Sequence, residues 1–110
     1  MLYNVVTTRN FERAFKRLVK KYVSLSKEYE QLIDELEVNP GIGIPLGNNL
    51  FKIRLAIASK CKGKSGGARV ITYLRTKQET VWLLSIYDKG EKNTMSDIEI
   101  QNILEGALER

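Results

Sequence analysis

The chain has no histidine, one cysteine, Cys61, and two prolines among its 110 residues. Without histidine, acid–base catalysis by imidazole and metal sites ligated by imidazole are impossible. A lone cysteine cannot form an internal disulfide or a thiolate zinc site, and it has no histidine to activate it as a nucleophile. We therefore expect no metal, no cofactor and a reducing, cytoplasmic environment.

Long hydrophobic runs are also missing. The longest run, Val81 to Leu84, is far shorter than a membrane span requires. The N-terminus lacks the basic stretch and apolar core of a signal peptide. We predict no membrane association. With 43% hydrophobic and 28% charged residues, the composition is typical of a globular protein. The length suits a single domain spanning residues 1–110.

The first half of the chain has helical periodicity after a short opening strand, Leu2 to Val6. Apolar residues recur at steps of three and four in two successive stretches, one basic and one acidic on its polar side. They predict two amphipathic helices that form an antiparallel hairpin. The cluster Asn39-Pro40-Gly41 ends the second helix.

The second half has strand periodicity. Three consecutive strands are predicted over Leu50–Ala58, Ala68–Arg75 and Val81–Tyr87. Ser96 and Glu99 form a capping box that starts a short C-terminal helix. The order describes an α+β fold, with an N-terminal strand, a helical hairpin, a three-stranded mostly antiparallel sheet and a final helix. We expect the helices on one face of the sheet and the other face open.

The segment from Lys52 to Gln78 carries eight cations and no acid. These residues are Lys52, Arg54, Lys60, Lys62, Lys64, Arg69, Arg75 and Lys77. Folded together they repel one another, so an anionic partner explains the pattern better than stability does. The net charge of +5 agrees with a polyanion such as RNA. A solvated basic face is the alternative.

Three glycines and a serine lie between Lys62 and Arg69. They let the backbone approach a phosphate closely and aim amide N–H groups at it. The spacing is not that of a Walker A loop, and a strand rather than a helix follows, so ATP binding is not expected. A flexible hairpin connection is the alternative.

Strand parity places Lys52 and Arg54 on one face, and Arg69, Tyr73 and Arg75 together on the next strand. The two sets can meet on one cationic face. Tyr73, and Tyr87 at the end of the last strand, could stack on unpaired bases, although both suit a partly buried core as well.

Three motifs together resemble a known family: Phe51 to Arg54 (FKIR), Gly63 to Ile71 (GKSGGARVI) and Ile86 to Lys89 (IYDK). The chain resembles the RelE/ParE superfamily of toxins from bacterial type II toxin–antitoxin systems, particularly the HigB-like RelE branch. The likeness spans nearly the whole length, including the turn at Asn39-Pro40 and the final helix.

The resemblance implies a ribosome-dependent endoribonuclease that cuts translated mRNA in the A site without a metal. A ribose 2'-OH would attack the adjacent phosphate, leaving a 2',3'-cyclic phosphate and a 5'-OH. The implied partners are the ribosome, mRNA and a cognate antitoxin, usually a helix-turn-helix protein in this branch. A higher-order complex of toxin and antitoxin on operator DNA is also implied.

The resemblance also implies roles for individual residues. The catalytic set would be Lys52, Arg54, Arg69 and Lys89. For RNA binding, the pattern of cations and aromatic rings itself predicts Lys60, Lys62, Lys64, Tyr73, Arg75 and Tyr87. Lys52 would serve as the base, and the planar fork of Arg69 suits the charge that develops on phosphorus. For the acid that protonates the leaving group, Tyr87 and Lys89 are the nearest candidates.

Two other functions fit the same residues. One is a ParE-like inhibitor that binds DNA gyrase and needs no catalytic basic set. The other is a basic RNA-binding module without catalysis, which predicts affinity without cleavage. The eight cations favour RNA over gyrase.

Overall fold

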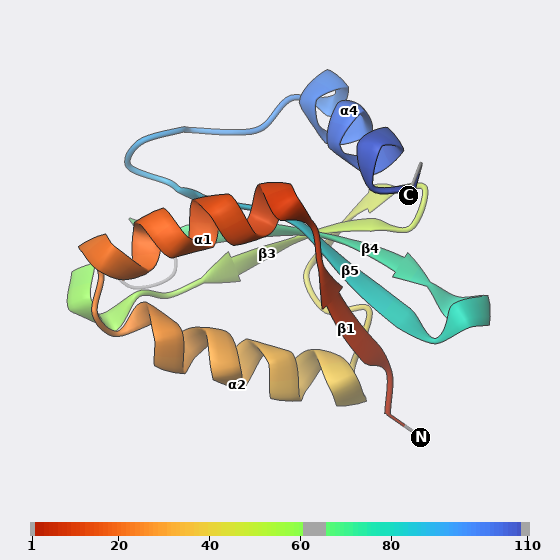
Figure 1. Ribbon diagram of the computed structural model, residues 1–110, viewed down its shortest axis with the longest axis horizontal. Coiled ribbons are helices and arrows are strands. Elements are labelled where there is room, and N and C mark those ends of the chain that lie inside the picture. The colour runs from red at the N-terminus through yellow and green to blue at the C-terminus, as the bar shows by residue number, and fades with distance from the viewer. Residues whose placement is uncertain (1, 61–65, 109–110) are drawn as a thin grey trace.

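The computed structural model describes residues 2–60 and 66–108. In chain order the elements are β1 (Asn4–Thr7), α1 (Arg9–Lys21), α2 (Leu25–Val38), β2 (Ile44–Gly47), β3 (Leu50–Leu55), η1 (Ala58–Lys60), β4 (Ala68–Arg75), η2 (Thr76–Gln78), β5 (Thr80–Asp88) and α4 (Asp97–Leu108). The predicted α+β order of strand, helical hairpin, three strands and final helix is confirmed (Figure 1).

The strands form one five-stranded sheet in the order β1-β5-β4-β3-β2. β1 runs parallel to β5, and the other neighbours are antiparallel. The mostly antiparallel arrangement is confirmed, but the sheet has five strands and not the predicted three, because β1 and β2 also join it. The predicted strand from Leu50 to Ala58 is too long, because β3 ends at Leu55 and a short 3-10 turn follows.

The edge strand β2 was not predicted from the sequence. This strand contains Pro45 and lies at the sheet edge with all four residues exposed, a position where a proline costs no internal hydrogen bond. Asn48 and Asn49 join it to β3, with φ of 55° and 64°. Asparagine tolerates this left-handed conformation, so the Asn-Asn pair was the overlooked hairpin signal.

The helical hairpin packs on one face of the sheet. Buried residues of α1 and α2, among them Phe11, Leu18 and Leu32, contact Ile53, Val70 and Leu83 of the strands. Thr8 fixes the start of α1, since its hydroxyl accepts from the backbone N–H of Phe11 and donates to the carbonyl of Leu84. This cap connects the helix to β5, an interior strand of the sheet.

α4 covers part of the opposite face, so the expectation of helices on one face only was wrong. Ile100, Leu104 and Ala107 of α4 pack against Ile71 and Leu84. In Figure 1, α4 lies above the strands and α2 below them. The predicted capping box is present, with reciprocal Ser96–Glu99 hydrogen bonds of 3.1 and 3.2 Å. No helix within residues 2–60 and 66–108 is long and apolar enough to cross a membrane.

Candidate active site

Arg54, Arg69 and Tyr87 form one row across three strands. The register places Arg54 of β3 opposite Arg69 of β4, and Arg69 opposite Tyr87 of β5. Directly opposed residues share a face, with Cβ atoms about 5 Å apart. Tyr87 belongs to the cluster under α4, which puts the row on the α4 face of the sheet. The predicted meeting of the two strands' cations therefore occurs.

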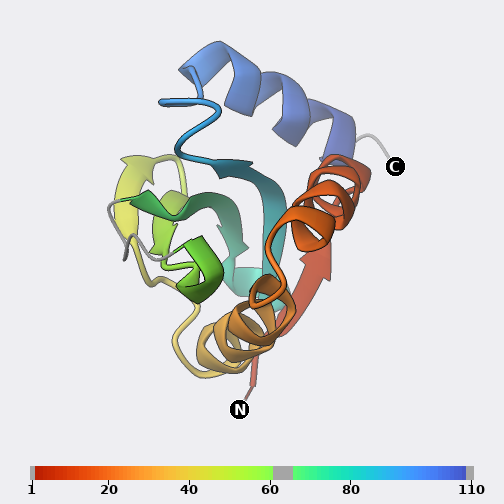
Figure 2. The ribbon, with the colours of Figure 1, turned by 90° about the vertical axis from the view of Figure 1, so that its left-hand side faces the viewer.

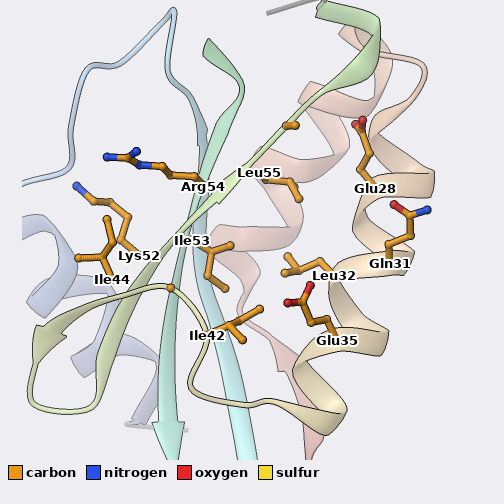
Figure 3. Close-up of a pocket in the computed structure, with 12 residues that line it drawn as sticks. Glu28, Gln31, Leu32, Glu35, Ile42, Ile44, Lys52, Ile53, Arg54 and Leu55 are labelled. Atoms are coloured by element: carbon orange, nitrogen blue, oxygen red, sulfur yellow. The ribbon is translucent and has the colours of Figure 1, made fainter. Parts of the chain in front are cut away.

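Lys52 lies in the next row on the same face. It is two residues before Arg54, opposite Ile71 of β4 and Ile44 of β2. Lys52 is half-buried and Arg54 is exposed. In Figure 3 both side chains extend from the same side of β3. We use the name cationic row for these four residues together: Arg54, Arg69 and Tyr87 of the first row, and Lys52 of the neighbouring one.

Arg69 is the most enclosed cation of the cationic row. The residue is only 5% exposed, and its Nη1 donates to the carbonyl of Ala68 at 3.1 Å. Burial on the central part of the sheet restricts the side chain, so little ordering is needed when it meets a ligand. A guanidinium keeps its charge even when enclosed, and its planar fork matches two oxygens of a phosphate.

Tyr87 is also largely buried, at 5% exposure, and packs within the α4 cluster. The base-stacking prediction for this ring has little exposed surface to support it. Lys89 follows β5 directly, and its Nζ donates to the carbonyl of Asn93 at 3.0 Å and to the side-chain oxygen of the same residue.

The other two predicted residues of β4 lie farther along that strand. Tyr73 packs against the α4 cluster opposite Leu50, two residues beyond Ile71, which is the residue opposite Lys52. Arg75 lies six residues beyond Arg69, about 20 Å at the usual rise of a strand. The fold therefore brings together Lys52, Arg54, Arg69 and Tyr87 but not Arg75.

Lys60 has an internal partner that its sequence neighbourhood did not reveal. Its Nζ lies 2.5 Å from a carboxylate oxygen of Asp88, and the two side chains are 8% and 1% exposed. The hydroxyl of Tyr22 donates to the other carboxylate oxygen at 2.5 Å, and the N–H of Gly90 donates to the oxygen that Lys60 binds, at 2.8 Å. The idea of eight cations without a counter-ion is therefore wrong for Lys60.

The environment of Asp88 strongly favours its charged form. Burial alone would raise the pKa of Asp88, but hydrogen bonds from Lys60 and Tyr22 outweigh burial and lower the pKa to about 2. The sequence analysis missed this residue as a structural acid. The available signal was its place inside the IYDK motif, where it is the single acid between Glu79 and Glu91.

Two contacts hold the ends of the glycine-rich segment against β5. Lys60 precedes the segment and binds Asp88, and the carbonyl of Gly67 accepts from the N–H of Lys89 at 3.0 Å. A Cβ on Gly67 would lie 2.1 Å from the carbonyl oxygen of Leu55, so close packing requires glycine here. The predicted phosphate-binding residues Lys62 and Lys64 lie outside the described residues.

A groove of about 470 Å³ runs between α2 and β3. Leu32 and Ile53 contribute to its apolar lining, and Glu28 and Glu35 lie on its α2 side. Lys52 and Arg54 also line the groove, and Figure 3 shows their side chains extending away from these α2 residues. The groove therefore adjoins the cationic row along β3. No group of three or more potential metal ligands from Cys, Asp and Glu occurs in the described part of the chain.

The family model that matches this chain is one of toxins from toxin–antitoxin systems. The chain belongs to the RelE toxin family: the model of the family described as "RelE toxin of RelE / RelB toxin-antitoxin system" matches residues 5–109. The resemblance noted in the sequence is thereby confirmed at the level of RelE.

Solved structures agree on the fold. The chain is similar to the E. coli toxin RelE, solved in the free state as an arginine-to-alanine double mutant, with 16% identity, a TM-score of 0.58 and coverage of 100% of this chain and 98% of that one. It is also similar to a chain of the toxin–antitoxin complex RelBE2 from Mycobacterium tuberculosis, with 16% identity, a TM-score of 0.54 and coverage of 80% and 92%. A metal-bound toxin from Helicobacter pylori gives 18% identity, a TM-score of 0.52 and coverage of 84% and 99%.

Proposed function

We propose that this chain is a metal-independent endoribonuclease that cuts mRNA on the ribosome, as the toxin of a type II toxin–antitoxin pair. The observation that carries the proposal is the cationic row, in which Arg54 and Arg69 lie side by side with Lys52 one row away. Membership of the RelE toxin family supports the same conclusion. Two guanidinium groups on one face can bind the oxygens of one phosphate together, which supports an anionic substrate for this site.

The reaction needs a base, a stabiliser of charge on phosphorus and an acid. Lys52, in its neutral form, accepts the proton of a ribose 2'-OH, whose oxygen bonds to the adjacent phosphorus. The bond from phosphorus to the 5'-oxygen breaks, which leaves a 2',3'-cyclic phosphate and a 5'-OH. Arg69 and Arg54 bind the phosphate oxygens while negative charge increases on them.

Tyr87 donates the proton that the leaving 5'-oxygen takes up. It lies opposite Arg69, inside the cationic row, whereas Lys89 lies beyond the end of β5 and binds Asn93. A donor must reach the leaving oxygen while the arginines hold the phosphate, and the position of Tyr87 suits that requirement better.

Dependence on the ribosome follows from the openness of the site. The groove between α2 and β3 is lined by Lys52 and Arg54 but not by Arg69 or Tyr87, so it does not enclose the whole site and supplies few walls to orient an RNA chain there. Orientation of the attacking 2'-oxygen in line with the leaving oxygen accounts for a large part of such a rate. A ribosome that holds the mRNA in its A site supplies this orientation.

The proposed partners are the ribosome, mRNA and a cognate antitoxin. A structural relative was solved in a toxin–antitoxin complex, which supports the antitoxin. The helix-turn-helix type of antitoxin, the complex on operator DNA, the cytoplasmic location and membership of the HigB-like branch stay predictions from the sequence.

The test is to map mRNA 5' ends in a translation extract with the parent protein, with Lys52→Ala/Arg69→Ala, and with Lys77→Ala as a control. Lys77 is exposed in η2 and has no place in the proposed site. We expect codon-phased cuts with the parent and the control, none with the double variant, and none without ribosomes. Cuts by the double variant would refute the site. Intact mRNA with gyrase-dependent DNA damage would establish the ParE-like alternative instead.

A further inference from the structure

The solvent face of α1 carries a straight line of four cations. Arg9, Arg13, Lys16 and Lys20 are spaced by four, three and four residues, which places them along one side of a helix. All four are exposed, and none forms an ion pair or side-chain hydrogen bond with any described residue. We call these four residues the α1 stripe.

The neighbouring cations of α1 differ from the α1 stripe in having partners. Arg17 lies 3.0 Å from a carboxylate oxygen of Glu91, and Lys21 lies 3.0 Å from the other oxygen. The fold therefore supplies an acid to one line of cations and none to the line beside it. General solvation of a basic helix does not account for this difference.

The α1 stripe is costly for the isolated helix. Like charges three or four residues apart repel each other, and Arg9 also lies in the first turn, where the helix dipole disfavours a cation. Glu12, the acid of the first turn, accepts a hydrogen bond from Thr7 and forms no ion pair with the stripe. An anionic partner would remove this repulsion.

The α1 stripe and the cationic row lie on different sides of the molecule. α1 buries Phe11 and Leu18 against one face of the sheet, whereas Tyr87 of the row packs on the other face. In Figure 2, α1 lies on the right and β3 on the left of β5. One anion cannot neutralise both sets, so the stripe needs a ligand of its own.

We propose that the α1 stripe binds the phosphate backbone of double-helical RNA and docks the toxin on the ribosome independently of the cleavage site. The role in docking rests on the proposed function, whereas the duplex binding does not. From Arg9 to Lys20 the stripe is about 16 Å long, enough to face several phosphates of a duplex.

The composition of the surface favours a duplex over other anions. Single-stranded RNA is usually bound with aromatic rings that stack on the bases, and no aromatic residue lies within the α1 stripe. Protein interfaces have an apolar centre, yet the described part of α1 contributes none of the large exposed hydrophobic residues. Cations alone match the recognition of A-form RNA by its backbone.

The experiment compares two variants of equal net charge. Lys16→Gln/Lys20→Gln removes two charges from the α1 stripe, and Lys27→Gln/Lys77→Gln removes two exposed charges elsewhere. Glutamine keeps good helix propensity at both sites of the first variant. Binding of a fluorescent RNA duplex is measured by anisotropy over a series of salt concentrations. Cleavage is measured on ribosomes programmed with mRNA, over a series of toxin concentrations.

We expect the stripe variant to bind the duplex about 10-fold more weakly, and the slope of log affinity against log salt to fall by about 2, because each lost phosphate contact removes about 0.9. The toxin concentration for half-maximal cleavage should rise while the maximal rate is unchanged. The control should match the parent in both assays. Unchanged duplex binding, or an equal loss in the control, overturns the proposal. A parent that binds the duplex but never cleaves on ribosomes refutes the proposed function alone.

Discussion

Arg54 and Arg69 lie directly opposite each other on the antiparallel strands β3 and β4. Arg69 is nearly buried and Arg54 is exposed, so the fold restricts one guanidinium while the other stays accessible to a ligand. A phosphate that binds both gains two charge-assisted hydrogen-bond donors. This relationship predicts that activity and stability respond differently to a substitution of Arg54.

Arg54→Gln should inactivate the protein without destabilising it. Arg54 is exposed, so we expect the free energy of unfolding to change by less than about 0.5 kcal/mol. Urea denaturation checks this value. Cleavage on ribosomes should fall by about 10-fold or more, because one of the two phosphate-binding guanidinium groups is lost. A variant that is markedly less stable than the parent would mean that its loss of cleavage reports the fold and not the site.

Lys52→Ala should reduce the rate of cleavage by about 10²- to 10⁴-fold, the usual contribution of a general base. The fold should persist, since Lys52 is half-buried and forms no side-chain hydrogen bond within the described residues. Lys52→Arg should not restore the rate, because a guanidinium cannot lose its proton near neutral pH. The cleavage rates of the parent, Lys52→Ala and Lys52→Arg are measured under single-turnover conditions on ribosomes programmed with mRNA. Restored activity in Lys52→Arg would assign to Lys52 a purely electrostatic role.

Most of the fold follows from local patterns in the sequence. The alternation around Ile53, the helical stripes of α1 and α2 and the Ser96 capping box specify elements that the structure contains. The side of the sheet on which α4 packs depends on long-range contacts such as those of Leu104, which no periodicity reveals. β2 was missed because a four-residue edge strand with a proline has no distinctive pattern.

The candidate site was predictable only in part, for a related reason. Strand parity was enough to place Lys52, Arg54 and Arg69 on one face. Parity gives no information about position along the strand. It therefore also assigned Arg75 to the RNA-binding face, although Arg75 lies at the far end of β4. The partner of Lys60 is Asp88, 28 residues later in the chain, and only the fold brings the two side chains together.

Asp88→Asn should be the most destabilising single substitution among the polar residues discussed above. It leaves the ammonium of Lys60 nearly buried without a counter-ion, which typically costs about 3–5 kcal/mol. Denaturation by urea at neutral pH measures the loss. Asn retains the shape of the side chain, so a small effect would mean that charge contributes little at this position.

The same carboxylate predicts a dependence of stability on pH. The pKa of Asp88 is lowered to about 2 in the folded protein from an ordinary value of 3.8. A lowered pKa contributes stability that is present above pH 4 and is lost as the pH falls toward 2. The lowering corresponds to about 2 kcal/mol, of which roughly half should be lost by pH 3. The stability difference between the parent and Asp88→Asn should shrink accordingly between pH 6 and pH 3.

Tyr87→Phe tests the identity of the proton donor. The substitution keeps the ring in the α4 cluster and removes only the hydroxyl, so we expect a normal fold and a rate of cleavage reduced by about 10²-fold. Lys89→Gln should have a smaller effect, because Lys89 lies outside the cationic row.

An mRNA with sulfur in place of the 5'-oxygen at the cleavage site has a leaving group that needs no proton. This substrate should restore the rate of Tyr87→Phe and leave Lys52→Ala slow, since loss of the base is not compensated by a better leaving group. If sulfur restores Lys89→Gln instead, Lys89 is the acid and Tyr87 a packing residue.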